Sequence, residues 1–95
     1  MTGENLTKAT LIVVQLIRSN LTNVTLTGAD LAGTNLTGAD LTSAELTGAN
    51  LIGTRFGKAN LEGADLTGAI LTGAKLTGAK FCKTTMPDGA VNYSG

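Results

Sequence analysis

The side chains that could act as nucleophiles are three serines and one cysteine, and each lacks the partner that such chemistry requires. The sequence contains no His, which removes the commonest general base and the commonest metal ligand. Ser19, Ser43 and Ser94 therefore have no imidazole to activate them. Cys82 is the single cysteine, so an internal disulfide and a thiolate metal cage are both excluded. These residues argue against nucleophilic catalysis.

The acidic residues and the glycines do not form a ligand-binding motif either. The carboxylates are spread along the chain without the spacing of a calcium-binding loop. Glycine recurs at intervals of five residues, but the Gly-Lys-Ser or Gly-Lys-Thr ending of a phosphate-binding loop is absent. We therefore expect no cofactor, no metal site and no enzymatic activity.

Charge and hydropathy limit the classes of partner. The 95 residues include seven basic and seven acidic side chains, so the formal net charge is zero, which argues against a nucleic-acid-binding protein. The longest aliphatic run, residues 11–14, is followed by Gln15 and is far shorter than the ~20 residues of a membrane span. Since no secretory signal is recognisable, we expect a cytoplasmic protein without a membrane segment.

The elements that position the outward side chains follow from a repeat of five residues. Apolar residues occupy all 17 positions from 6 to 86 at this interval, as 14 Leu, Phe56, Phe81 and Met86. We name this position the centre. Ala stands two residues before 10 of the centres, Thr one residue after nine of them, and Gly two residues after nine. The consensus A-(D/N)-L-T-G is clearest at 29–33, 39–43, 49–53 and 64–68.

A period of five residues fits neither a helix nor a continuous strand. On an α-helix the leucines would spiral around the axis, and along a strand they would alternate between the two sides. A short extended segment followed by a corner resolves the conflict, because the corner shifts the phase by one residue. Glycine suits that corner, since a type II turn requires a positive φ. The chain is therefore predicted to coil, with neighbouring coils paired edge to edge about 4.8 Å apart.

This pattern resembles the pentapeptide repeat family over residues 4–88, and the ending 81–89 (F-C-K-T-T-M-P-D-G) resembles that of many cyanobacterial members. The resemblance implies an all-β fold, a right-handed quadrilateral β-helix of about four coils with four repeats and 20 residues per coil. We expect one domain over 1–95, with repeats at 4–88 and a tail or cap at 89–95. The expected structural core consists of Leu26, Leu31, Leu36, Leu41, Leu46, Leu51, Phe56, Leu61, Leu66, Leu71, Leu76 and Phe81.

With 20 residues per coil, the outward charges separate onto two opposite faces. The acidic face, with its centres at 6, 26, 46, 66 and 86, carries Glu4, Glu45, Asp65 and Asp88, with Lys8 near its start. The basic face, with its centres at 16, 36, 56 and 76, carries Arg18, Arg55, Lys58 and Lys75 and no acid. The two alternatives are a recognition surface for a charged partner and ordinary solvated charge. Stacking of Glu45 on Asp65 is expected to raise the pKa of one carboxyl group.

The two remaining faces are less charged. The apolar face, with its centres at 11, 31, 51 and 71, presents Ile12, Val13, Ala32, Ile52 and Ile70. It is either an interface or a set of β-branched residues that favour extended backbone. The fourth face carries Asn20, Asp40, Asn60 and Lys80 before its centres, and alternation of Asn with Asp is expected to allow hydrogen bonds along the ladder.

The ends of such a coil need protection from association. At the carboxyl end Pro87, Asp88 and Gly89 predict a turn, after which Ala90, Val91 and Tyr93 form either a cap or a frayed tail. Only residues 1–5 precede the first centre, Leu6. An end-to-end homodimer through the amino-terminal coil is therefore one hypothesis.

Two classes of function follow. The first is a non-enzymatic structural or protein–protein interaction module, whose protein partner is of unknown identity. The alternative, implied by the family resemblance, is a gyrase-interacting or gyrase-protecting protein that mimics duplex DNA. Mimicry requires a strongly negative surface, which a net charge of zero and a basic face disfavour. A fragment of a larger protein is a third alternative.

Overall fold

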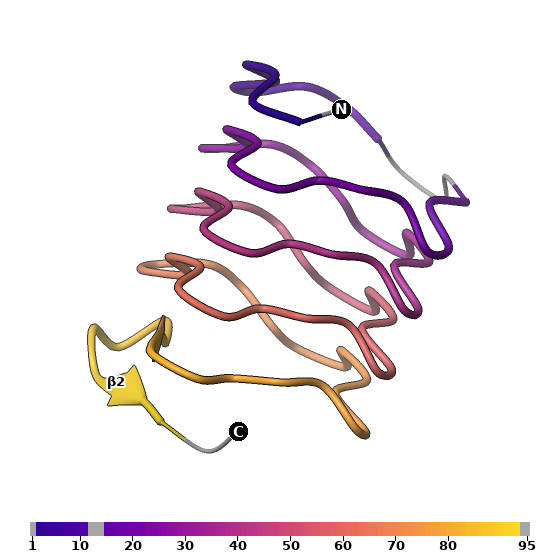
Figure 1. Cartoon of the computed structure of the whole chain (residues 1–95). Coiled ribbons are helices and arrows are strands. Elements are labelled where there is room, and N and C mark those ends of the chain that lie inside the picture. Colours follow the sequence, from indigo (N-terminus) through magenta and orange to yellow (C-terminus); the bar gives the residue numbers. More distant parts are fainter. Residues whose placement is uncertain (1, 12–14, 94–95) are drawn as a thin grey trace.

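The chain winds into a stack of four-sided coils in the computed structural model, which describes residues 2–11 and 15–93 (Figure 1). Single-residue parallel bridges join positions 20 apart, so each coil consists of four sides of five residues. One column of bridges connects Asn5, Thr25, Glu45, Asp65 and Thr85 in turn. The extents along the principal axes are 29, 26 and 21 Å.

Among the described residues, each corner of the coil is a tight turn closed by its own hydrogen bond. At a typical corner, the backbone N–H of Ala29 donates to the carbonyl oxygen of Leu26 over 3.0 Å. Gly28, the third residue of this turn, has a φ of 68°, as a type II turn requires. Six non-glycine residues adopt the same positive φ among the described residues: Lys8, Arg18, Asn23, Ser43, Lys58 and Lys83. The predicted role of glycine at the corner is therefore correct, although the corner also accepts other side chains.

Backbone hydrogen bonds join each coil to the next. The N–H of Leu26 donates to the carbonyl oxygen of Glu45 over 2.7 Å, and the N–H of Thr25 donates to Glu4 over 2.8 Å. A third bond, from Gly28 to Thr47 over 2.9 Å, joins the corners themselves. Because these bonds recur at every level, each coil is stabilised by its two neighbours along the stack.

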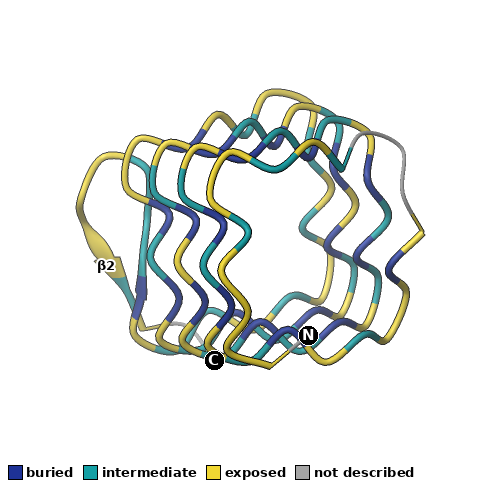
Figure 2. Cartoon of the chain, turned by 90° about the horizontal axis from the view of Figure 1, so that it is seen from above, coloured by how far each residue is buried: buried dark blue, intermediate teal, exposed yellow. Residues whose placement is uncertain are grey.

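The centres fill the interior, and burial depends on their level in the stack (Figure 2). Nine of the twelve residues assigned to the core are at most 1% exposed: Leu26, Leu31, Leu36, Leu41, Leu46, Leu51, Phe56, Leu61 and Leu66. Leu71, Leu76 and Phe81, which we also assigned to the core, are only partly buried and pack against it. They belong to the last coil, which has a neighbouring coil on one side only.

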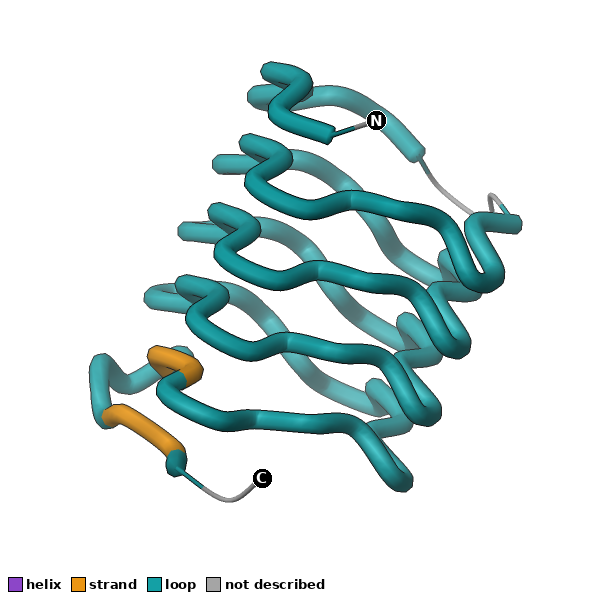
Figure 3. Tube along the Cα trace, viewed as in Figure 1, coloured by secondary structure: helices purple, strands orange, loops and turns teal. Residues whose placement is uncertain are grey.

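The two strands of the described chain form a hairpin at the carboxyl end. Strand β1 (Thr84–Thr85) pairs antiparallel with β2 (Val91–Asn92), as Figure 3 shows in orange. The N–H of Met86 donates to the carbonyl oxygen of Ala90 over 2.7 Å. The equivalent N–H of each earlier coil, such as that of Leu66, donates to a carbonyl oxygen of the following coil. The segment that leads into β2 therefore accepts the hydrogen bond that a further coil would accept at this side of the stack. Figure 2 shows β2 outside the four-sided outline, and Val91 is exposed.

Candidate interaction surfaces

Outward side chains are held in place by hydrogen bonds to their own coil. The Oδ1 atom of Asp65 accepts a bond of 3.0 Å from the N–H of Thr67, and it also accepts a bond from the Thr67 hydroxyl. Asn60 uses its Oδ1 in the same way, toward the N–H of Glu62 at 3.0 Å. This hydrogen bond explains why Asp or Asn precedes the centre and Thr follows it. The sequence signal for the bond is the (D/N)-L-T part of the consensus, which we had not interpreted in this way.

These bonds also determine the ionisation of two carboxyl groups. The hydroxyl and the N–H of Thr67 lower the pKa of Asp65, and the same groups of Thr42 lower the pKa of Asp40. A hydroxyl from Thr22, one coil earlier, adds to the effect on the pKa of Asp40. The hydrogen bonds from Thr67 outweigh the effect of burial, which acts in the opposite direction on the pKa of Asp65.

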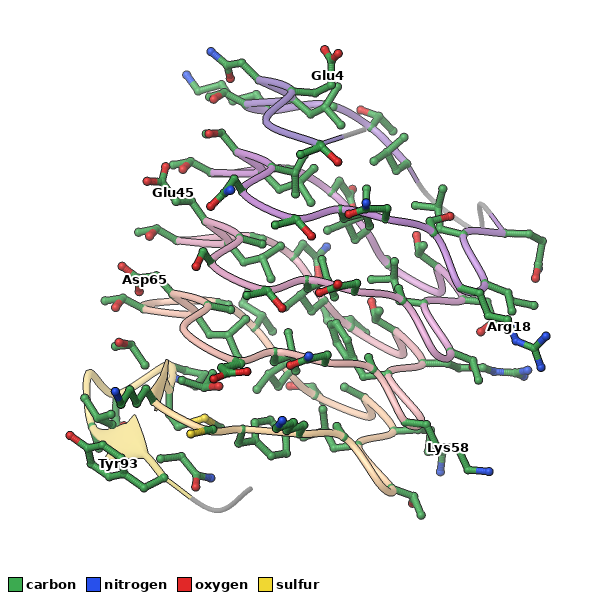
Figure 4. All side chains as sticks on the ribbon, in the orientation of Figure 1. Glu4, Arg18, Glu45, Lys58, Asp65 and Tyr93 are labelled. Carbon is green, nitrogen blue, oxygen red and sulfur yellow. The ribbon has the colours of Figure 1, made fainter. Side chains whose placement is uncertain are left out.

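The basic face is a wall of exposed cations. Arg55 and Lys75 form a parallel bridge, so these two cations project from directly adjacent coils. Arg18 and Lys58 are also exposed and lie at corners of the same wall, on the right of Figure 4. Ile17, 48% exposed, follows the centre at Leu16 and therefore belongs to this wall as well.

Glycine makes room for the long side chains of the basic face. Gly38 stands one coil below Arg18, and Gly78 stands one coil below Lys58. A methyl group at Gly38 would lie 3.2 Å from the Cγ atom of Arg18, and one at Gly78 would lie 3.3 Å from the Cγ atom of Lys58. The aliphatic stems of Arg18 and Lys58 therefore rest close to the backbone of the next coil.

The acidic face lies on the opposite wall. Glu45 and Asp65 project from the left of Figure 4, away from Arg18 and Lys58. Glu4 lies at the top of the stack, at the repeat position where Ala44 and Ala64 are buried, which corrects its assignment to the acidic face. Glu45 and Asp65 form a parallel bridge and therefore occupy adjacent coils. Asp88 is exposed in the turn after β1, and its Oδ1 accepts a 3.0 Å bond from the N–H of Ala90.

One ion pair is present among residues 2–11 and 15–93, and it belongs to neither charged wall. It joins Lys80 to Glu62 of the preceding coil with 3.8 Å between Nζ and Oε1. Both side chains stand on the fourth face and remain substantially exposed. The carboxylates of the acidic face and the cations of the basic face therefore have no counterion within the described chain.

The apolar face is narrower than the sequence indicated. Ile52 and Ile70 are 43% and 47% exposed and lie on adjacent coils. Ala32 is only half-buried and adds little apolar surface. Ile12 and Val13, which we assigned to the same face, lie outside the described residues. The structure thus brings together two of the five proposed residues as large exposed side chains.

Three threonines replace alanine at the inward position before a centre. The Thr54 hydroxyl is fully buried and donates to the carbonyl oxygen of Leu31 over 2.7 Å. Thr34 and Thr84 donate in the same way to Leu11 and Leu61. Every buried polar side-chain atom in the described parts of the chain has a hydrogen-bond partner. These hydroxyls are structural, and the sequence signal for them is Thr in place of Ala at this position.

The walls offer no enclosed site. No pocket opens among the described residues, and none of their His, Cys, Asp or Glu side chains cluster as metal ligands would. Within the same residues, no helix is long and apolar enough to cross a bilayer. The surfaces that can contact another molecule are therefore the walls themselves.

Comparison with known proteins agrees with this architecture. The family described as "Pentapeptide repeats (8 copies)" matches residues 19–57 and 44–81. The pentapeptide repeat protein Rfr23 from the cyanobacterium Cyanothece 51142 is 36% identical with a TM-score of 0.78, over 92% of this chain and 63% of its own. This chain thus spans less than two thirds of that relative. No curated protein sequence matches the chain.

Two further structures bear on the fold and its uses. A pentapeptide repeat protein from the thylakoid lumen of Arabidopsis thaliana is 33% identical with a TM-score of 0.59, over 92% of this chain and 68% of its own. The plasmid-mediated fluoroquinolone resistance protein QnrB1 is 21% identical with a TM-score of 0.59, over 90% of this chain and 50% of its own. At that identity the likeness shows the fold alone, a right-handed quadrilateral β-helix.

Proposed function

Because the chain belongs to the pentapeptide repeat family, we propose that it is a non-enzymatic module that binds another protein through a flat wall. The observation that carries this proposal is the exposure of Ile52 and Ile70, at 43% and 47%, on adjacent coils of one wall. Large apolar side chains grouped on a surface are typical of a protein contact site.

The two isoleucines are held in fixed positions relative to each other. The N–H of Leu51 donates to the carbonyl oxygen of Ile70 over 2.8 Å, which joins their coils. The Oδ1 atom of Asn50 accepts a 3.1 Å bond from the N–H of Ile52, so this amide oxygen is turned toward the backbone. A partner would therefore meet two pre-positioned apolar side chains, whose ordering costs little further entropy on binding.

Mimicry of duplex DNA in a contact with gyrase is less well supported. A DNA mimic needs a continuous negative surface, because DNA-binding proteins neutralise phosphates with cations. Here the acidic residues occupy one wall, and the opposite wall carries four exposed cations and no acid. The structural likeness to QnrB1, at 21% sequence identity, shows a shared fold alone.

The proposal is tested by affinity capture from a bacterial lysate with three immobilised proteins. These are the wild type, Ile52→Asp, and Thr47→Asp as the matched control at the same repeat position on the acidic wall. We expect at least one protein to be retained by the wild type and by Thr47→Asp and lost with Ile52→Asp. Once purified, that protein must bind the wild type and Thr47→Asp with similar affinity and must bind Ile52→Asp more weakly. Identical retention by all three, with their circular dichroism unchanged, would overturn the assignment of the apolar wall.

A further inference from the structure

The two charged walls match each other in spacing. Glu45 and Asp65 occupy adjacent coils through one parallel bridge, and Arg55 and Lys75 do so through another. Both pairs therefore have the spacing of the coils, about 4.8 Å. Glu45 and Arg55 are ten residues apart, which is half a coil, so the two walls are opposite and offset by only about 2.4 Å.

The charges on both walls are available to another molecule. Arg55, Lys75 and Glu45 are exposed, and the ion pair within the described chain uses none of them. Asp65 accepts its hydrogen bonds from Thr67 through Oδ1, which leaves Oδ2 for an incoming cation. The net charge of zero does not reveal that acidic and basic residues lie on opposite walls, because the seven positive and seven negative charges cancel only over the whole chain.

We propose that the acidic wall of one copy binds the basic wall of a second copy. The carboxylates of Glu45 and Asp65 would then meet the cations of Arg55 and Lys75, with the two coil stacks side by side. Because the two walls are different and lie on opposite sides, the contact is heterologous and continues as an open row rather than closing as a dimer. The apolar faces of successive copies would point the same way along such a row.

The size of the wall determines how strong the contact can be. The extents of 29, 26 and 21 Å allow a wall of about 550 Å² on each copy, and so about 1,100 Å² in a pair. That area lies at the low end of specific interfaces. Exposed ion pairs are individually weak and are screened by salt. The association is therefore weak, reversible and dependent on ionic strength.

The proposal is tested by sedimentation velocity of the full chain up to about 1 mM, at about 20 mM and about 500 mM NaCl. We expect the mass to rise with concentration at low salt and to remain that of the 9.6 kDa monomer at high salt. R55E/K75E lowers the association constant at least tenfold, and Glu45→Lys with Asp65→Asn has the same effect. Asn is used at position 65 because Asn60 makes the same hydrogen bond to the backbone. An equimolar mixture of the two variants regains association, since it restores opposite walls.

The matched control is K80E/K83E, which changes the net charge as much as R55E/K75E does but lies off both walls. It should associate as the wild type does. A wild type that is monomeric at low salt overturns the proposal, as does equal loss of association in R55E/K75E and in the control. A mass that doubles, stops there and is insensitive to salt indicates an end-to-end dimer instead. The Ile52→Asp protein should still form rows, so this inference and the proposed partner can fail separately.

Discussion

Truncation of Leu46 to alanine should destabilise the fold far more than the same truncation at Leu71. Both residues are centres of the repeat, but Leu46 is fully buried between coils above and below it. Leu71 belongs to the last coil and is half-buried. The comparison keeps the chemical change constant and varies only the level of the residue in the stack.

The expected magnitudes follow from that difference. Removing a fully buried leucine side chain costs about 2–5 kcal/mol, from lost transfer free energy and from the cavity that remains. Since a small domain is stable by only about 5–15 kcal/mol, Leu46→Ala removes a large share of the total. At Leu71 part of the side chain already faces water, and the open end lets solvent and neighbouring atoms fill the gap. Leu71→Ala should cost about 1–2 kcal/mol.

The measurement is urea denaturation followed by far-ultraviolet circular dichroism, with the m value compared among the wild type and both variants. A lower m value in Leu71→Ala alone would show that the last coil frays before the rest, as expected when each coil depends on its neighbours. Equal losses at Leu46 and Leu71, with unchanged m values, would refute the argument that the level in the stack determines the energetic weight of a centre.

Three further predictions follow from the corners, the carboxylates and the ends. Ser43 has a φ of 59°, so Ser43→Gly should raise the free energy of unfolding by about 1 kcal/mol, and a lower melting temperature would contradict this. The lowered pKa of Asp65 means that its stabilising contribution is complete above the ordinary value of 3.8 and is lost as the pH falls through the folded-state pKa. Melting temperatures from pH 7 to pH 2 should therefore fall less steeply below pH 4 in Asp65→Asn than in the wild type. An end-to-end homodimer through the amino-terminal coil is a proposal that light scattering tests at high salt, where a mass of 9.6 kDa at high micromolar concentration would exclude it.

The period of five residues was sufficient to predict the repeating unit and its corners. An apolar residue at every centre and glycine two residues after nine of them have one consistent geometry, and the structure has it. The resemblance to the family, rather than the period, supplied the number of sides, since any polygon with five-residue sides would satisfy the same pattern. Once 20 residues per coil is known, each outward residue is placed on a wall by its number alone.

Other features depended on geometry that the pattern does not contain. The last coil has no following coil, so Leu71 has the sequence of a core residue without the burial of one. The hydrogen bonds from Thr67 to Asp65 depend on the local turn, and the lowered pKa of Asp65 follows from them. Strand β2 pairs with β1 because the chain reverses after Pro87, whereas the sequence left a cap and a frayed tail as alternatives.

Insertion of one additional five-residue side would change the arrangement of the charges on the walls without changing the fold. Five residues, A-N-L-T-G, inserted after Gly48 add one side, so every later side turns by one wall while each centre still meets another centre. The backbone ladder and the core are therefore preserved, and the circular dichroism spectrum and melting temperature should remain close to those of the wild type.

The charges, in contrast, become mixed on the inserted chain. Asn60 and Lys80 then follow Glu45 on the acidic wall, whereas Arg55 and Lys75 move below Asp40 on the fourth face, so neither charged wall keeps its pair of like charges. Salt-dependent self-association in sedimentation velocity should disappear from a chain that is still folded. Loss of the fold would show that one side is not an independent unit of the stack, and undiminished association would show that the opposed walls are not its source. A retained fold together with lost association would show that the proposed self-association depends on the arrangement of charges by multiples of five rather than on a local motif.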